Sequence, residues 1–236
     1  MARRTYGQYC GLARALEFVG ERWAMLIIRD LLVGPRRFTD LQRLPRIPTN
    51  VLSARLREME ANGLIRRRVV PRPASGVVYE LTDYGAQLEP ILLSLGAWGA
   101  RALRDPTEGE VITPDSLVIA LRATFQPHAA PPRLVSFELR CGPAVVHCVV
   151  DHGELAVTDV GPLPGADAVI ETGPALRRLM AGEVAPEQAL ADGLVRVCGD
   201  AELLDRFVEM FHIDSLPVSQ GVLEQARAGA ATVHAG

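Results

Sequence analysis

The clearest hydrophobic pattern in this chain lies in residues 49–61, where Leu52, Leu56 and Met59 recur at helical spacing. The positions between them are mostly polar or charged, which is typical of a helix that packs one face on a core. An Asn-Gly pair ending at Gly63 follows, and glycine readily adopts the left-handed backbone that ends a helix. The pattern therefore predicts an amphipathic helix with a defined end.

A shorter helix is predicted just before it. Thr39 and Gln42 have the spacing of a capping box, in which the hydroxyl accepts an amide hydrogen bond and the glutamine side chain reaches back. Pro45 and Pro48 cannot continue a helix and favour extended backbone in the residues before them. We therefore expect a helix that begins at Thr39, then a tight turn, and then the amphipathic helix.

The segment after the amphipathic helix has the pattern of a hairpin. Residues 64–70 are rich in β-branched side chains and in arginine, residues 71–76 are turn-like, and residues 77–81 form a second strand-like run. Helix, turn, helix and basic hairpin, in this order, predict a winged helix-turn-helix, in which the second helix reads DNA and the hairpin, or wing, lies along the duplex backbone.

Two apolar helices are predicted at residues 10–19 and 22–33, separated by Gly20 and closed by Gly34-Pro35. The side chains expected in their core are Trp23, Leu26, Ile27 and Leu31.

A longer apolar helix is predicted at residues 84–103, capped by Thr82-Asp83 and interrupted mildly by Pro90. Its apolar side chains are Leu88, Ile91, Leu92, Leu95 and Trp98. This is more apolar surface than one small core can cover, so we expect the helix to pair with a copy of itself. A two-fold homodimer would hold two recognition helices about one DNA turn, roughly 34 Å, apart, which predicts an inverted-repeat operator.

The pattern changes after a polar hinge at residues 105–110. We predict a helix at residues 113–125 with Thr113 as its cap, then a last helix capped by Asp200. Between them we expect two helices that begin near Pro174 and Pro186, and strands at residues 133–140, 144–150, 154–160, 168–172 and 194–198, the first four as an antiparallel meander. The predicted organisation is a mainly α winged helix-turn-helix at residues 1–104, an α+β unit with an antiparallel sheet at residues 112–214, and a flexible tail at residues 215–236.

The charge is divided between the two halves. The net charge of the whole chain is -3, but residues 1–104 hold 17 arginines against 9 acidic residues, whereas residues 105–236 hold 8 arginines against 19 acidic residues. A basic surface attracts phosphate and an acidic one repels it. We therefore expect only the first half to contact double-stranded DNA.

The candidate DNA contacts are short hydrogen-bonding side chains on the first turns of the recognition helix, and arginines on its flank, before the first short helix and on the wing. Small polar groups can reach base edges in a major groove, and arginines neutralise phosphates. The candidates are Arg36, Arg37, Thr39, Thr49, Asn50, Ser53, Arg55, Arg57, Arg68 and Arg72. The alternatives are an ordinary amphipathic surface helix and, for Arg36 and Arg37, a solvated turn.

Residues 8–101 resemble the HxlR family of bacterial winged helix-turn-helix transcription regulators, relatives of the MarR group. The matching elements are Cys10, Gly20-x-x-Trp23, the run 34–41 (GPRRFTDL), Val51-Leu52-Ser53-x-Arg55-Leu56, Gly63-Leu64, Tyr79-x-Leu81-Thr82-x-x-Gly85 and Trp98. The resemblance implies a dimeric repressor or activator, and some members sense thiol-reactive compounds or aldehydes through a cysteine that matches Cys10. The second half of the chain is a departure from the plain family.

The order of elements in residues 112–213 resembles a sterol carrier protein type two domain. That resemblance implies an apolar tunnel for lipids or other hydrophobic molecules. The candidate tunnel residues are Phe125, Phe137, Val146, Leu155, Leu179, Phe207 and Phe211. Each of them is also a candidate for plain core packing.

Catalytic chemistry is not indicated. The sequence contains no GxSxG, HExxH or phosphate-binding glycine loop, and no CxxC pair, so we expect no enzyme activity, metal or cofactor. It lacks an apolar stretch of signal-peptide or membrane-spanning length, so we expect a cytoplasmic protein without a membrane partner.

These patterns support three hypotheses. The first is a dimeric transcription regulator whose operator binding is modulated by a hydrophobic small molecule in the second half. The second is a regulator that senses thiols or electrophiles through Cys10. The third is a carrier or accessory protein for hydrophobic ligands that uses the winged helix as a dimerisation scaffold.

Overall fold

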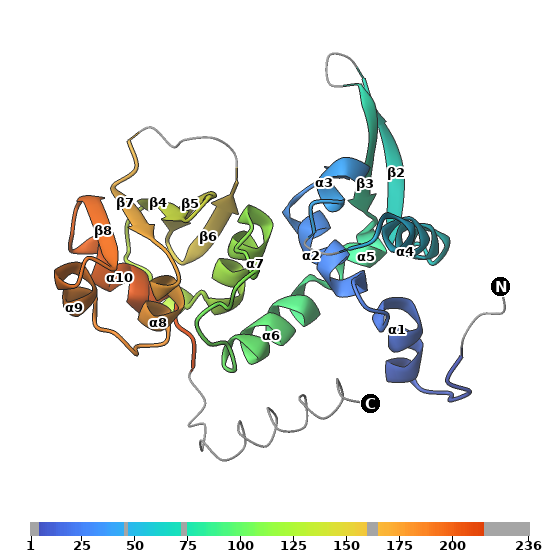
Figure 1. The fold of residues 1–236 in the computed structure, drawn as a ribbon, viewed down its shortest axis with the longest axis horizontal. Helices are drawn as coiled ribbons and strands as arrows, with labels where there is room; N and C mark the ends of the chain where they lie inside the picture. Colours follow the sequence, from blue (N-terminus) through green and yellow to red (C-terminus); the bar gives the residue numbers. More distant parts are fainter. Residues whose placement is uncertain (1–4, 45–46, 72–74, 160–164, 215–236) are drawn as a thin grey trace.

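The computed structural model describes residues 5–44, 47–71, 75–159 and 165–214. These residues form two units, each with its own hydrophobic core, which lie side by side and are joined through α6 and α7 (Figure 1). The predicted turn residue Pro45, the wing residue Arg72 and the tail 215–236 lie outside the described residues.

The first unit is the predicted winged helix-turn-helix. Its sheet is antiparallel, in the order β1-β3-β2. Its elements are α1 (Gly11–Val19), α2 (Ala24–Val33), β1 (Arg36–Arg37), α3 (Phe38–Leu41), α4 (Thr49–Ala61), β2 (Ile65–Val70), β3 (Gly76–Leu81), α5 (Asp83–Ala86) and α6 (Glu89–Ala100).

Helix α4 confirms the prediction made from the amphipathic pattern. Leu52, Leu56 and Met59 are all buried in the first core. Gly63 has a φ of 72°, and the amide of Leu64 donates to the carbonyl of Met59 at 2.9 Å, which closes the helix with a Schellman motif. The helix therefore begins and ends where the sequence predicts.

The predicted capping box at the start of α3 is wrong. The helix begins at Phe38, and the Asp40 carboxylate accepts the backbone N–H of Arg37 at 3.0 Å. An acidic group in the first turn is a favourable partner for an unpaired amide, because both the hydrogen bond and the helix dipole stabilise it. Gln42 instead donates its side-chain amide to the Thr49 hydroxyl at 2.8 Å, so it ties the two helices together across the turn.

The predicted long helix at residues 84–103 is divided into α5 and α6. The Thr82 hydroxyl accepts the amide of Gly85 at 3.1 Å, so the predicted cap is confirmed. Pro90 lies in the first turn of α6, where its missing N–H costs no hydrogen bond, and the break therefore falls just before it. A Cβ on Gly85 would lie 2.0 Å from the carbonyl oxygen of Leu64, so glycine is required for this contact between α5 and the base of the wing.

The predicted core of α2 is only partly correct. Ile27 and Leu31 are buried, but Leu26 is exposed on the surface. Trp23 is half-buried and precedes the helix with a φ of 80°. Ile27 and Leu31 lie on the buried face of α2. Leu26 is one residue before Ile27, which rotates its side chain by about 100° around the helix axis, toward solvent.

The second unit is an α+β unit, and its sheet corrects the prediction of an antiparallel one. The strand order is β6-β5-β4-β7-β8, and β7 pairs with β4 in parallel. The elements are α7 (Pro114–Thr124), a 3-10 turn (Pro127–Ala129), β4 (Val135–Cys141), β5 (Ala144–Asp151), β6 (Glu154–Thr158), β7 (Ala168–Thr172), α8 (Ala175–Met180), α9 (Pro186–Ala191), β8 (Val195–Gly199) and α10 (Leu203–Met210). Strand β7 lies on the other side of β4 from β5 and β6, and a hydrophobic pattern carries no information on this placement.

Helix α7 belongs to both cores. Thr113 and Ser116 cap its start with reciprocal hydrogen bonds, as expected for Thr113. Leu117, Val118 and Leu121 pack in the second core, whereas Ile119 packs in the first. The helix lies between the two units in Figure 1 and forms most of the contact between them, against α2 and α6. Within the described ranges, no helix has the length and apolar character needed to cross a bilayer.

Candidate nucleic-acid interface

The polar face of α4 is assembled as the sequence predicts. Thr49, Asn50 and Arg57 are exposed, and Ser53 is half-buried between them. Leu52 is on the opposite, buried side of the helix. The Arg57 guanidinium donates to the carbonyl of Ser53 at 3.1 Å, which holds the side chain along the helix. This face offers three small hydrogen-bonding side chains and an arginine to a groove.

Arg55 has a different environment from the other α4 candidates. Its side chain is 18% exposed and lies 2.5 Å from Glu58, with Glu21 at 3.9 Å. Glu21 precedes α2, so Arg55 connects the recognition helix to the scaffold behind it. A guanidinium held by two carboxylates is available to DNA only in part.

The wing carries three consecutive arginines, each oriented by a glutamate. Arg66 and Arg68 both donate to Glu80 on β3, at 2.8 and 2.6 Å, and Arg67 donates to Glu60 at the end of α4, at 2.9 Å. The hydrogen bonds from Arg68 and Arg66 lower the pKa of Glu80, and the bond to Glu60 raises the pKa of Arg67. The arginine side chains are 47–66% exposed, so each keeps donors for a phosphate.

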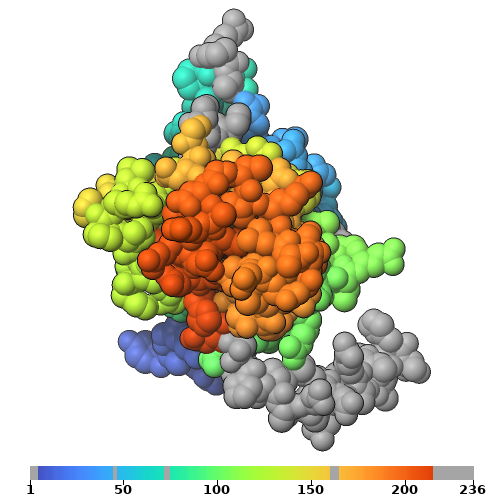
Figure 2. All heavy atoms as spheres, turned by 90° about the vertical axis from the view of Figure 1, so that its left-hand side faces the viewer, coloured from blue at the N-terminus to red at the C-terminus, as the bar shows by residue number. Residues whose placement is uncertain are grey.

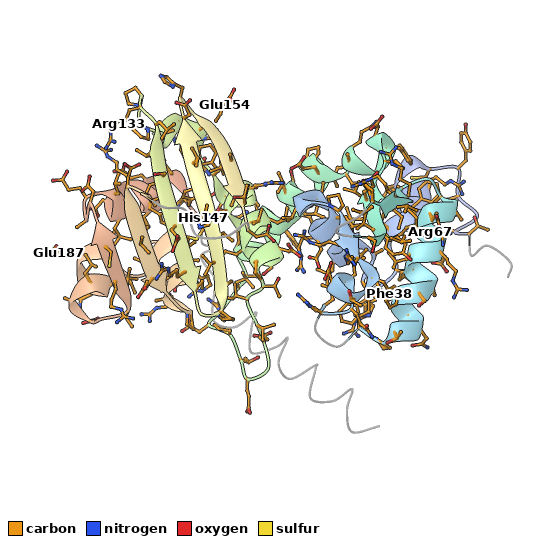
Figure 3. The ribbon with its side chains drawn as sticks, turned by 90° about the horizontal axis from the view of Figure 1, so that it is seen from above. Phe38, Arg67, Arg133, His147, Glu154 and Glu187 are labelled. Carbon is orange, nitrogen blue, oxygen red and sulfur yellow. The ribbon has the colours of Figure 1, made fainter. Side chains whose placement is uncertain are left out.

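Arg67 is a candidate that sequence analysis missed. Successive side chains of a strand point to opposite faces, so Arg67 lies on the face of β2 opposite Arg66 and Arg68. Figure 3 shows it beside α4, on the side of the first unit that is turned away from the sheet of the second unit. In Figure 2, taken from the side of the second unit, the hairpin projects above that unit. The alternation of side chains along a strand, applied to residues 66–68, already assigns Arg67 to one face and Arg66 and Arg68 to the other.

The structure does not bring Arg36 to this surface. Its guanidinium donates to both carboxylate oxygens of Asp115 on α7, and to Asp159 at the end of β6 at 3.1 Å. Arg36 therefore faces the second unit, and the expectation that it meets a phosphate beside α3 is corrected. Arg37 points along the wing, because its Nη1 atom lies 3.0 Å from the place of a Cβ on Gly76. Thr39 is exposed on α3.

The predicted tunnel residues lie in the second core, where they pack against one another. Phe137, Val146, Leu179, Phe207 and Phe211 are fully buried there. The ring centroid of Phe207 is 5.7 Å from that of Phe137 and 4.7 Å from that of Phe211.

The two remaining candidates, Phe125 and Leu155, are half-buried at the edge of this core. The ring centroids of Phe125 and Phe211 are 5.5 Å apart.

Two cavities in the described part of the chain lie elsewhere. One of about 250 Å³ lies between α6, the end of α7 and residues 212–214, with Trp98 and Arg101 in its wall. The other, of about 500 Å³, lies between the 3-10 turn and α10, with Arg133 and Arg206 in its wall. None of the predicted tunnel residues lines either cavity.

Cys10 is exposed and directly precedes α1. Hydrogen bonds from the backbone amides of Ala13 and Leu12 lower the pKa of its thiol. Burial has the opposite effect on two other cysteines, because it raises the pKa of Cys141 to about 11 and that of Cys148 to about 12. Cys10 therefore has the features of a reactive thiol, and these two do not.

An apolar surface remains on the first unit. Ile91, Leu95 and Trp98 on α6 are 51–69% exposed, at positions that share one helical face. Leu12 and Leu16 of α1 are exposed as well. Large apolar side chains gathered on one surface commonly mark a protein interface.

A polar-faced helix that follows a short helix and a turn, with an arginine-bearing hairpin beside it, defines a winged helix-turn-helix DNA-binding protein. A family model described as HxlR-like helix-turn-helix matches residues 18–106. YvaP of Bacillus subtilis is 37% identical over 95 residues, which are 40% of this chain and 87% of YvaP. YkvN of the same organism is 36% identical over 112 residues, which are 46% of this chain and 95% of YkvN. The chain belongs to the HxlR family of helix-turn-helix transcriptional regulators.

Solved structures match the same region. The redox regulator HypR in its reduced form is 33% identical, with 38% of this chain and 90% of HypR covered and a TM-score of 0.36. Quinone-bound YodB of Bacillus subtilis is 34% identical, with 37% of this chain and 93% of YodB covered and a TM-score of 0.33. The sequence relatives named above match over most of their own length and over less than half of this chain, and the family model ends at residue 106, before the second unit.

Proposed function

We propose that this HxlR-type regulator binds an inverted-repeat operator as a homodimer. The observation that carries the proposal is that the polar face of α4 and the arginine side chains of β2 are both exposed, and that Arg67 of β2 is held beside α4 by Glu60. Thr49, Asn50 and Ser53 reach base edges from α4, while the wing arginines neutralise phosphates.

The homodimer forms through the exposed apolar face of α6. Burying Ile91, Leu95 and Trp98 against a second copy removes their apolar area from water, which is the main driving force for such association. The test is Leu95→Asp combined with Trp98→Asp. We expect a monomer in sedimentation analysis and loss of tight binding to a two-half-site operator. A variant that stays dimeric would show that the interface lies elsewhere.

The DNA-binding proposal is tested by selecting fragments of the source genome with the purified protein. We expect enrichment of sequences with two inverted half-sites whose centres lie about one helical turn apart. The affinity for such a fragment should fall steeply with salt, because each phosphate contact releases counterions. Binding without sequence enrichment would overturn the operator proposal, and no binding would favour the alternative of a dimerisation scaffold in a carrier protein.

We further propose that a hydrophobic small molecule bound to the second unit modulates operator binding. The order of α7, β4 to β8 and α8 to α10 supports the likeness to a sterol carrier type two domain. Because the ring of Phe207 packs against those of Phe137 and Phe211, entry of a ligand requires these rings to separate. Operator affinity is measured with and without a panel of hydrophobic compounds, and no change across the panel would remove this part of the proposal.

A second candidate function is redox or electrophile sensing through Cys10. The observation that favours it is an exposed thiol at a helix start, with a lowered pKa. HypR is described as a redox regulator and YodB has been solved with a quinone bound, and this chain shares 33% and 34% identity with them. Treatment with diamide should change the operator affinity of the wild type and leave Cys10→Ser unaffected. Equal responses would dispose of Cys10 as the sensor.

A further inference from the structure

The surface where the two units meet is organised by one face of α7. Asp115, Ile119 and Arg122 follow one another at intervals of four and three residues, so they form a single stripe. Ile119 is buried in the first core, and Asp115 binds Arg36. Arg122 donates to the carbonyl of Leu32 at 3.4 Å, and also to the carbonyl of Val157 at 3.3 Å in its own unit. The stripe is apolar in the middle and charged at both ends.

The contact of Arg36 is the most constrained at this surface. Its guanidinium uses Nε and Nη2 to hold Asp115 in a fork, and Nη2 also reaches Asp159 at 3.1 Å. All three side chains are 19–26% exposed, so solvent screens the contact only in part. We name these three residues the Arg36 clamp. Forked arginine–carboxylate pairs fix direction as well as distance, which a single contact does not.

The clamp acts on the base of the wing through the backbone. Arg36 lies on β1, which pairs with β3, with Arg36 opposite Tyr79 and Arg37 opposite Val78. The next residue of β3 is Glu80, the carboxylate that orients Arg66 and Arg68. A displacement of β1 is therefore passed to β3 and then, through Glu80, to Arg66 and Arg68 of the wing.

The carboxylates of the clamp come from the second unit, Asp115 from α7 and Asp159 from the end of β6. Arg36 lies inside the region matched by the family model, whereas Asp115 and Asp159 lie beyond its end at residue 106. The second unit thus supplies the partners for an arginine of the DNA-binding unit.

We propose that Arg36 is a positioning residue for DNA binding: held by Asp115 and Asp159, it fixes the base of the wing relative to the second unit without touching DNA itself. The proposal rests on the proposed DNA-binding function. A ligand of the second unit that favours an open clamp would, by the same route, loosen the wing and weaken operator binding.

The test compares Arg36→Ala with the double variant Asp115→Asn and Asp159→Asn in the full chain. Both open the clamp, from opposite sides, so both should weaken binding to a labelled operator fragment by the same factor, about 3- to 30-fold. Combining all three changes should add nothing. Removing two carboxylates makes the protein less negative and by charge alone would strengthen DNA binding, so the expected sign is opposite to the simple electrostatic one.

Two further measurements separate positioning from direct contact and from unfolding. The slope of log affinity against log salt should stay at the wild-type value in Arg36→Ala, whereas loss of a phosphate contact would lower it by about 0.9. Amide hydrogen exchange should accelerate in β1 and β3 and remain unchanged in α10, with the midpoint of thermal unfolding within a few degrees of wild type.

Matched controls are available within the second unit. Arg177→Ala removes a forked arginine that is 16% exposed and binds Glu183 and Asp105. Asp192→Asn with Asp205→Asn removes two exposed carboxylates of the second unit. Neither control should weaken operator binding.

The proposal would be overturned by a reduced salt slope in Arg36→Ala, by tighter binding of Asp115→Asn with Asp159→Asn, or by additive effects. If the wild-type protein binds no duplex, the proposed DNA-binding function is wrong, and the proposed role of Arg36 is wrong with it. If wild type binds and the clamp variants bind equally well, only the role of Arg36 fails.

Discussion

The first unit exposes the side chains on which its proposed function depends, whereas the second unit encloses its candidates. In the first unit, Asn50 and the wing arginines are exposed or half-exposed. In the second, Phe137 and Phe207 are sealed among other core side chains. The same contrast separates Arg67, which is 58% exposed, from Arg36, which is 19% exposed. Accessibility rather than residue type therefore decides which predicted residue is available to a partner.

The largest expected effect concerns the enclosed side. Phe207→Ala should destabilise the protein by about 3–5 kcal/mol, because a large ring leaves a cavity in a packed core. Chemical denaturation measures the change, with Val208→Ala, at a half-buried neighbouring position, as the milder control. A Phe207→Ala protein of wild-type stability would break the contrast, since it would mean that the ring lines a space that is empty without ligand.

The exposed side is tested most strongly at α4. Asn50→Ala should weaken binding to the selected operator by about 1–3 kcal/mol, the range for one base contact, and leave binding to unrelated duplex nearly unchanged. Thermal melts should match wild type because the side chain is exposed. Equal losses on both duplexes would assign Asn50 to the phosphate backbone instead.

The wing should give a smaller effect that does not depend on sequence. Arg67→Ala should weaken every duplex several-fold and lower the salt slope by about 0.9, because one phosphate contact is lost. Salt titrations on operator and random duplex measure both quantities. Glu60→Gln is the matched control, since it releases Arg67 without removing its charge. An unchanged slope in Arg67→Ala would remove it from the interface.

The smallest effect concerns Asp30, a buried carboxylate on α2. Burial raises its pKa from 3.8 to about 6, while the adjacent Arg29 acts in the opposite direction. Above pH 6 the folded protein holds a charge that burial disfavours, and this cost disappears as pH falls toward 4. The stability of Asp30→Asn relative to wild type should therefore increase as pH rises from 4 to 7 and level off above pH 6. A difference independent of pH would contradict the assignment.

The local pattern of this sequence predicts most helices and strands correctly. Leu52, Leu56 and Met59 define α4 through a period that any amphipathic helix must have, and Gly63 defines its end. Pro90 predicts an interruption of the long helix, but not its full division into α5 and α6. The close approach of Gly85 to Leu64 joins segments that a linear pattern does not connect.

Contacts between distant segments could not be predicted in the same way. The parallel pairing of β7 with β4 depends on a crossing connection. The contact of Arg36 with Asp115 joins residues that are 79 positions apart. At the candidate site, Thr49 and Asn50 were found from helical period alone, whereas the position of Arg67 beside α4 depends on how the hairpin packs against that helix.

The place of Ile119 has a consequence for anyone who wishes to cut this protein in two. Cleavage in the loop at residues 105–110 would remove Ile119, a buried member of the first core, from the DNA-binding half. Keeping α7 with that half would leave Leu117 and Leu121 bare to water. Either fragment would expose apolar core side chains to water and would tend to aggregate. The second unit therefore cannot be moved to another regulator by a simple gene fusion at this loop.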